Sequence, residues 1–355
     1  MKQAKFFVRS LNLALLSACM LLVLGLSSCG CNRDKEDDFG REVSQDQLDS
    51  LSNIKVSIIR YEKDLFSIPP DSLKEKLLQC KDKYKGFYSA EVLEDANEML
   101  RIKQYIADPM IQSLYREVMK QYPSVAWLEK DLTNMFRRIK VLMPDWKVPV
   151  VYTYVSGGDI SYPVKYANDQ VIIALDLFLG HNYPVYQMWS LPVYITNRMT
   201  KEYVVLSTAT EIGRAYVDRY AGRGKSMLEQ MIYGGKLLYF TDVAVPDALD
   251  WVRVGYTTQQ LAWAERNQGN VWSFFIEKKL LHTTEMKDIN KFIGEAPFTS
   301  SFSKNSAPRI GRYIGWQIVR AYMAKNKDVT VPELLKNKNA QEILNKSGYK
   351  PKKEE

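Results

Sequence analysis

Histidine is the scarcest of the residues that could do chemistry in this chain. Only His181 and His282 occur in 355 residues, and neither lies near a nucleophile-elbow pattern, which argues against Ser–His–Asp hydrolysis. A catalytic zinc site usually takes two or three histidines, so the count also argues against most zinc enzymes. We expect His181 to cap the end of a strand and His282 to follow a helix C-terminus, where an imidazole interacts favourably with the helix dipole.

Two glycine-containing motifs resemble nucleotide-binding loops only in part. Gly224-Lys225-Ser226 copies the end of a P-loop, but Arg219 stands where the first glycine belongs and no predicted strand precedes it. Gly157-Gly158 lacks the third glycine and the following helix of a dinucleotide fingerprint. We therefore predict a helix–helix loop and a turn at these two places, and we expect no cofactor.

The first 28 residues are typical of an export signal. Three basic residues precede an apolar stretch over 11–26, and Leu26-Ser27-Ser28-Cys29 has the lipobox pattern of bacterial lipoproteins. The pattern predicts a signal peptide over 1–28 and a lipidated Cys29, anchored by several acyl chains. An uncleaved anchor helix and a Sec signal cut elsewhere are the alternatives. Cys31 is a poorer lipid acceptor, because a serine would then replace leucine three positions upstream.

The charge of the chain does not indicate a nucleic-acid partner. The formal charge of +8 includes three basic residues of the predicted signal, so the mature chain would carry +5. Basic residues are mixed with acidic ones throughout, and no basic run of five occurs. Cys31 and Cys80 would remain after processing; we favour two unpaired thiols, although a disulfide is open.

The remaining sequence predicts a tether and one folded unit. Residues 29–53 are highly charged and have few large apolar residues, as expected of a solvated tether. Residues 54–350 are predicted to form a single globular domain, with room for two subdomains around a cleft, and 351–355 a tail. Strand-like runs at 147–180 lie between helical segments, which predicts an α+β fold, mainly α-helical with a small, mostly antiparallel sheet. The longer helices are expected at 201–219, 225–242, 258–280 (with a break near Gly269) and 307–325.

Several ordered motifs resemble the gliding-motility lipoprotein family (GldB type) of the Bacteroidetes. They run in order from residue 54 to 351 and include YEKDLF at 61–66, VPVVYTYVSG at 148–157, IALDLFLG at 173–180, LEQMIYGGKLLYF at 228–240 and GRYIGWQIVRAYM at 311–323. The resemblance implies an envelope lipoprotein linked to gliding motility. It does not imply that the organism itself glides, because similar proteins occur in non-gliding Bacteroidetes.

A more distant resemblance is to thermolysin-like zinc peptidases, which carry His-Glu-x-x-His on one helix and a third ligand, Glu, about 20 residues later. At the corresponding spacing this chain has Thr210, Glu211, Arg214 and Gly234. Only the general-base glutamate is kept. Threonine is a poor zinc ligand, arginine repels the metal and glycine offers no side chain. The resemblance therefore implies a degenerate peptidase fold with no metal and no catalytic residues, in which Glu211 and Arg214 could form an ion pair.

The leading hypothesis from the sequence is a non-catalytic lipoprotein that supports gliding motility, or a related secretion or envelope machinery, by binding other envelope proteins. An open strand edge near 173–180 is expected to accept an extended peptide. The lipid would anchor it in the cell envelope, and we expect the outer membrane. The alternatives are a peptidase or other hydrolase that acts through Glu211, and a protein that binds an envelope glycan or lipid.

Overall fold

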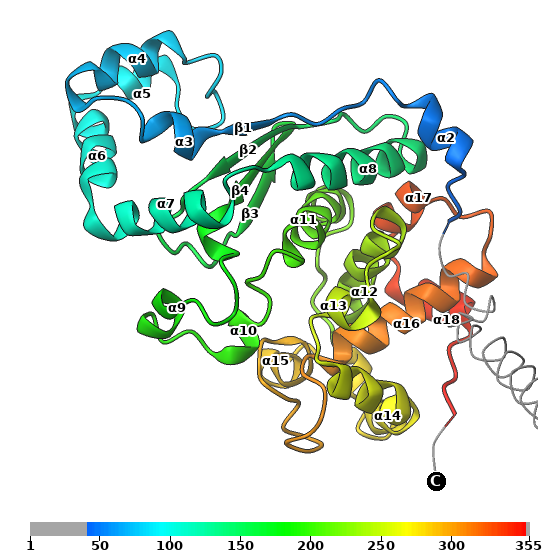
Figure 1. Ribbon diagram of the computed structural model, residues 1–355. Coiled ribbons are helices and arrows are strands. Elements are labelled where there is room, and N and C mark those ends of the chain that lie inside the picture. Colours follow the sequence, from blue (N-terminus) through cyan, green and yellow to red (C-terminus); the bar gives the residue numbers. More distant parts are fainter. Residues whose placement is uncertain (1–40, 353–355) are drawn as a thin grey trace, which may run out of the picture. The chain divides into compact units, whose positions relative to one another are not determined.

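A four-stranded mixed sheet lies at the centre of the computed structural model, which describes residues 41–352 (Figure 1). The strands are β1 (Ile58–Arg60), β2 (Val150–Tyr154), β3 (Val164–Ala167) and β4 (Gln170–Ala174), in the order β1-β2-β4-β3. Together with the many helices, this confirms the α+β prediction.

The prediction of a mostly antiparallel sheet is wrong. Strands β1 and β2 are parallel, and so are β2 and β4; only the β3–β4 hairpin is antiparallel. The chain between β1 and β2 is long and helical, which allows the crossover that a parallel pair needs. β4 then inserts between β2 and β3. The runs of β-branched residues predicted the strands, but they carry no information about strand direction.

The first helices after β1 pack around a small aromatic core of their own. They are α3 (Tyr61–Leu65), α4 (Leu73–Gln79), α5 (Ala90–Glu94) and α6 (Ala96–Ala107). The buried residues of α7 (Pro109–Gln121) and α8 (Ala126–Leu142) join the main core instead, and α2 (Gln45–Ser50) precedes β1. Asp108 separates α6 from α7, because its Oδ1 accepts hydrogen bonds from the amides of Met110 and Ile111, and Pro109 begins the new helix. Tyr61 stacks on Phe87 in the small core, with ring centroids 3.9 Å apart.

Helix α12 (Met227–Ala244) is buried on every side. Only Glu229 and Leu238 of its 18 residues are not buried, as expected of a helix at the centre of a helical layer. It packs against α11 (Tyr203–Tyr220) and most extensively against α16 (Ile310–Lys325). Its first turn has a capping box, in which Ser226 and Glu229 each bind the other's backbone amide.

The remaining helices surround this layer. They are α9 (Pro184–Met188), α10 (Val193–Thr196), α13 (Asp250–Val254), α14 (Thr258–Glu277), α15 (Met286–Ile293), α17 (Val331–Lys336) and α18 (Ala340–Ser347). Helix α14 is continuous, so the predicted break near Gly269 is wrong; Gly269 is buried within the helix. Among residues 41–352, no helix combines the length and apolar character needed to cross a membrane.

Candidate functional site

Thr210, Glu211, Arg214 and Gly234, the four positions singled out in the sequence, all line one cavity of about 480 Å³. The first three come from α11 and Gly234 comes from α12. These two helices pack against each other, which brings the four positions together. The walls also include the start of α16, the loop before β3, and residues of α10, α13 and the end of α15. That these positions descend from metal ligands stays a prediction.

The ion pair expected between Glu211 and Arg214 is present. Arg214 Nε donates to Glu211 Oε1 at 3.0 Å, one turn along α11, and both side chains are about one-third exposed or less. Arg214 Nη1 also donates to the Tyr233 hydroxyl of α12, at 3.4 Å. Burial raises the pKa of Glu211, and the charge of Arg214 opposes that rise without cancelling it.

The side chains at the expected ligand positions do not fit a zinc ion. The Thr210 hydroxyl donates to the carbonyl oxygen of Leu206 at 2.8 Å, and Arg214 is a cation. Gly234 is covered by Arg312, whose Cγ lies 3.2 Å from the place of a Cβ on that glycine. Residues 41–352 contain no group of three or more His, Cys, Asp or Glu side chains placed to hold a metal ion.

A group of arginines that line the same cavity was not predicted from the sequence. Glu295 Oε2 accepts from Arg198 Nη2 at 2.7 Å, and its Oε1 accepts from Arg309 Nη1 at 3.2 Å. Arg312 Nη1 lies 3.6 Å from the same Oε1. One carboxylate is therefore shared by three guanidinium groups. Arg198 and Glu295 are 97 residues apart, so no local spacing links them.

A second cavity, of about 470 Å³, shares Tyr203, Gly255, Glu295 and Arg309 with the first. Aromatic side chains are prominent in its lining: Tyr194, Tyr203, Trp251 and Tyr256. His181, which was expected to cap a strand end, lies in this lining too. His282 is not among the residues that line either cavity. It ends a short 3₁₀ helix after α14.

The open strand edge is not where the sequence predicted it. Residues 173 and 174 belong to β4, which pairs with β2 on one side and β3 on the other. The two edge strands are β1 and β3. The one beside the cavity is β3, which packs against α11. Within the described residues no other segment forms backbone hydrogen bonds with the outer edge of β3. Ile160, Ser161 and Pro163, which line the first cavity, lead directly into this strand.

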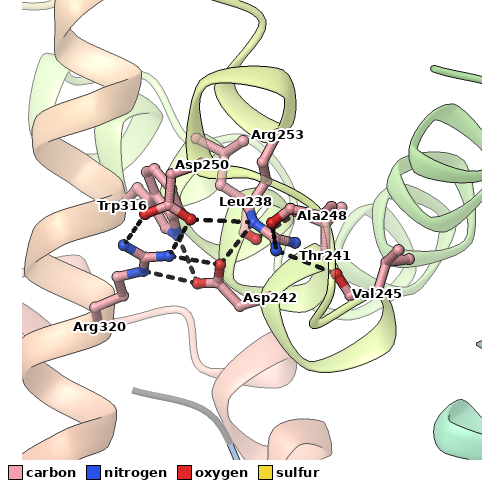
Figure 2. A network of polar contacts seen from close by, with 9 residues as sticks. All are labelled: Leu238, Thr241, Asp242, Val245, Ala248, Asp250, Arg253, Trp316 and Arg320. Atoms are coloured by element: carbon pink, nitrogen blue, oxygen red, sulfur yellow. Dashed lines mark hydrogen bonds and ion pairs between the residues drawn. The ribbon is translucent and has the colours of Figure 1, made fainter. Parts of the chain in front are cut away.

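A network of charges connects α12, α13 and α16 (Figure 2). Asp242 of α12 accepts hydrogen bonds from Trp316 Nε1 at 2.7 Å and from Arg320 Nη2 at 2.8 Å, and it pairs with Arg253 Nε at 2.9 Å. Asp250 pairs with the other side of Arg320, at 2.9 Å. Because Arg253 also lines the cavity, the network ties α12, α13 and α16 together at the site.

Comparison with known proteins identifies the family. Residues 43–351 match the family described as gliding motility protein GldB. This chain belongs to the GldB family. The resemblance predicted from the sequence motifs is thereby confirmed. No curated protein and no solved structure matches the chain, so the thermolysin-like relationship stays a prediction.

Membership of the GldB family links the chain to gliding motility and to the other proteins of the motility machinery. A gliding-motility lipoprotein family also indicates a location in the cell envelope. The predicted lipid acceptor Cys29, its alternative Cys31 and the signal peptide lie outside the described residues. Cys80, the other thiol expected after processing, is a free cysteine in the described part of the chain.

Proposed function

We propose that this GldB-family chain is a non-catalytic envelope lipoprotein that supports gliding motility, or a related secretion or envelope machinery, by binding another protein at the rim of the first cavity. The observation that carries the proposal is the position of an open strand edge beside that cavity. Strand β3 follows directly on the lining residue Pro163, and within the described residues its outer edge has no backbone partner of the kind that an added strand would supply.

Exposed apolar side chains beside the same cavity support protein binding. Ile160 lines the cavity and is 45% exposed; Tyr162, between two lining residues, is 60% exposed. Large apolar side chains grouped around a concave site are typical of protein-binding surfaces.

The charges around Glu211 support a role without catalysis. Glu211 Oε1 accepts from Arg214 Nε at 3.0 Å, so the glutamate has a structural partner in the cavity wall without any substrate. The retained glutamate then serves to hold Arg214 in place across the helix turn.

A hydrolase acting through Glu211 is the second candidate. The observation that favours it is the raised pKa of Glu211, which results from burial in a cavity wall. The aromatic lining of the second cavity is the corresponding observation for glycan or lipid binding. The two experiments below distinguish these alternatives from protein binding.

Site-specific photo-cross-linking in the cell envelope tests the proposal. A benzophenone amino acid replaces Ile160 or Tyr162 at the rim, and Leu100 of α6, which is 52% exposed, serves as the control position. We expect both rim positions to capture the same protein and Leu100 not to capture it. Absence of a protein product from the rim, or the same product from Leu100, would contradict protein binding at this surface.

The variant Glu211→Gln separates a binding protein from a hydrolase. It removes the carboxylate charge and keeps the size of the side chain. We expect the rim cross-links to persist, and we expect the variant to restore gliding in a strain that lacks its own family member. Loss of gliding with intact folding and intact cross-links would instead support the hydrolase.

A further inference from the structure

The first cavity has a surplus of positive charge. Six arginines line it (Arg198, Arg214, Arg223, Arg253, Arg309 and Arg312), against two acidic residues, Glu211 and Glu295. Asp242 and Asp250 meet the charge of Arg253 outside the cavity. The five other arginines therefore share the two carboxylates of the lining and that of Asp218, which lies close to Glu211 and Tyr233. Cavities with such a surplus attract anions and hold them through charge-assisted hydrogen bonds.

Among the three arginines around Glu295, Arg312 has the most unused hydrogen-bonding capacity. A guanidinium has five N–H donors. Within residues 41–352, the charged contact of Arg312 is the 3.6 Å approach to Glu295, which is too long for a good hydrogen bond. Its stem lies over Gly234 on the cavity wall, and the side chain is 36% exposed.

The surroundings of Arg312 make a bound anion favourable. Burial and the neighbouring charge of Arg309 lower the pKa of Arg312 to about 10, and Arg198 and Arg214 act in the same direction. Arg312 also lies in the first turn of α16, where the helix dipole adds positive potential. An anion placed there would relieve repulsion among four guanidinium groups.

The geometry of a guanidinium group matches both carboxylate and phosphate. The surfaces next to the arginines therefore indicate which of the two anions the cavity binds. The open edge of β3 begins beside the cavity, and its backbone groups suit an extended peptide. Apolar lining residues, among them Leu206, Leu237 and Ile293, suit the side chains of such a peptide.

We infer that the arginine-lined cavity binds a carboxylate of an extended peptide segment, with Arg312 as its principal partner and Arg214, which lines the same cavity, as a second. The carboxylate is that of the peptide's C-terminus or of an Asp or Glu side chain. This inference rests on the proposed protein-binding function and specifies the chemistry of the bound partner.

Three tetrapeptide mixtures distinguish these sources when passed over the immobilised chain. The first has free C-termini and no Asp or Glu; the second has amidated C-termini and one Glu; the third has amidated C-termini and no acidic residue. We expect the first or second to be retained about tenfold more strongly than the third, as expected for one charge-assisted pair. Equal retention of all three would overturn the inference.

Charge variants connect the binding to the cavity. Arg312→Gln should remove the preference for carboxylates, whereas Arg101→Gln, which removes an exposed arginine of α6, should not. Glu295→Gln should strengthen retention, because it leaves Arg198, Arg309 and Arg312 without their shared carboxylate. Since misfolding would weaken retention, a gain in this variant has no trivial structural origin. A preference that survives Arg312→Gln would overturn the assignment.

The remaining outcomes separate this inference from the proposed function. Arg312-dependent binding of inorganic phosphate or of phosphatidate-containing vesicles, without retention of any peptide mixture, would overturn the peptide assignment. If rim cross-links to a partner persist while acidic and neutral peptides bind equally, the carboxylate inference fails and protein binding stands. If the cross-links are absent as well, both fail.

Discussion

Gly235 of α12 and Gly315 of α16 lie backbone against backbone. A Cβ added to Gly235 would collide with the carbonyl group of Gly315 and would lie 2.8 Å from the amide nitrogen of Trp316. A Cβ on Gly315 would collide with the carbonyl group of Met231 in the same way. The two helices that carry Gly234, Arg312 and the buried charge network are thus positioned by a contact that only glycine permits.

Substitution of Gly235 by alanine should destabilise the fold. The new methyl group would meet backbone that cannot move aside, and overpacking of this kind costs about 1–3 kcal/mol. Gly234→Ala is a matched control: it lies on the same helix and gains the same helix propensity, about 1 kcal/mol, but its Cβ faces the flexible stem of Arg312 at 3.2 Å. Urea denaturation of both variants measures the difference. Equal stabilities would show that the helices separate easily.

Asp242 should be the most sensitive acidic residue of the buried network. Replacement by Asn leaves Arg320 and Arg253 short of a buried counter-charge, and loss of one partner in such a pair costs about 3–5 kcal/mol. Asp288→Asn is the control, because its pair with Lys291 is exposed and worth about 0.5 kcal/mol or less. Free energies of unfolding at neutral pH test this. A loss no larger than that of the control would mean that Arg320 finds sufficient compensation in Asp250.

The local parts of this structure could be predicted from the sequence, because they depend on residues close together in the chain. The spacing of Glu211 and Arg214 on a predicted helix indicated their ion pair, and it formed. The apolar pattern of LEQMIYGGKLLYF indicated a helix, and α12 covers it. Glu211 and Gly234 lie on different helices, and only the resemblance to zinc peptidases grouped them; both line one cavity.

Long-range relationships could not be predicted in this way. The Arg198–Glu295 pair depends on how the segments before α11 and after α15 meet, and neither residue carries a local pattern. The direction of β2 relative to β1 depends on the helices between them, as does the place of β4 inside the sheet. The arginine-lined character of the cavity therefore became visible only in the structure.

Lys236 should make the stability depend on pH in the alkaline range. It is buried on α12, with Nζ donating to the carbonyl oxygen of Asn337, and burial lowers its pKa from 10.5 to about 8. Between about pH 8 and 10.5 the unfolded chain therefore binds more protons than the folded chain. Stability from this group rises with pH in that window, by at most about 1.4 kcal/mol per pH unit.

The comparison of the natural chain with Lys236→Met isolates this effect from other titrating groups. We expect the difference in unfolding free energy to shift in favour of the natural chain between pH 7.5 and 9.5. The direction follows because burial destabilises the folded chain only while Lys236 is protonated, and this cost disappears as the lysine loses its proton. A difference that does not change with pH would show that Lys236 keeps an ordinary pKa.

Cys29 is the predicted site of lipid attachment, and it allows a test that is independent of the cavity. In cells fed an alkyne-tagged fatty acid, the natural chain should become labelled and partition with membranes. Cys29→Ser should lose both properties, because several acyl chains supply the apolar surface for durable anchoring. Cys31→Ser, two residues away, should keep both. If labelling is lost in Cys31→Ser and kept in Cys29→Ser, Cys31 is the lipid acceptor. If the natural chain is not labelled at all, the prediction of lipid attachment is wrong, and the apolar segment over 11–26 is left as the anchor.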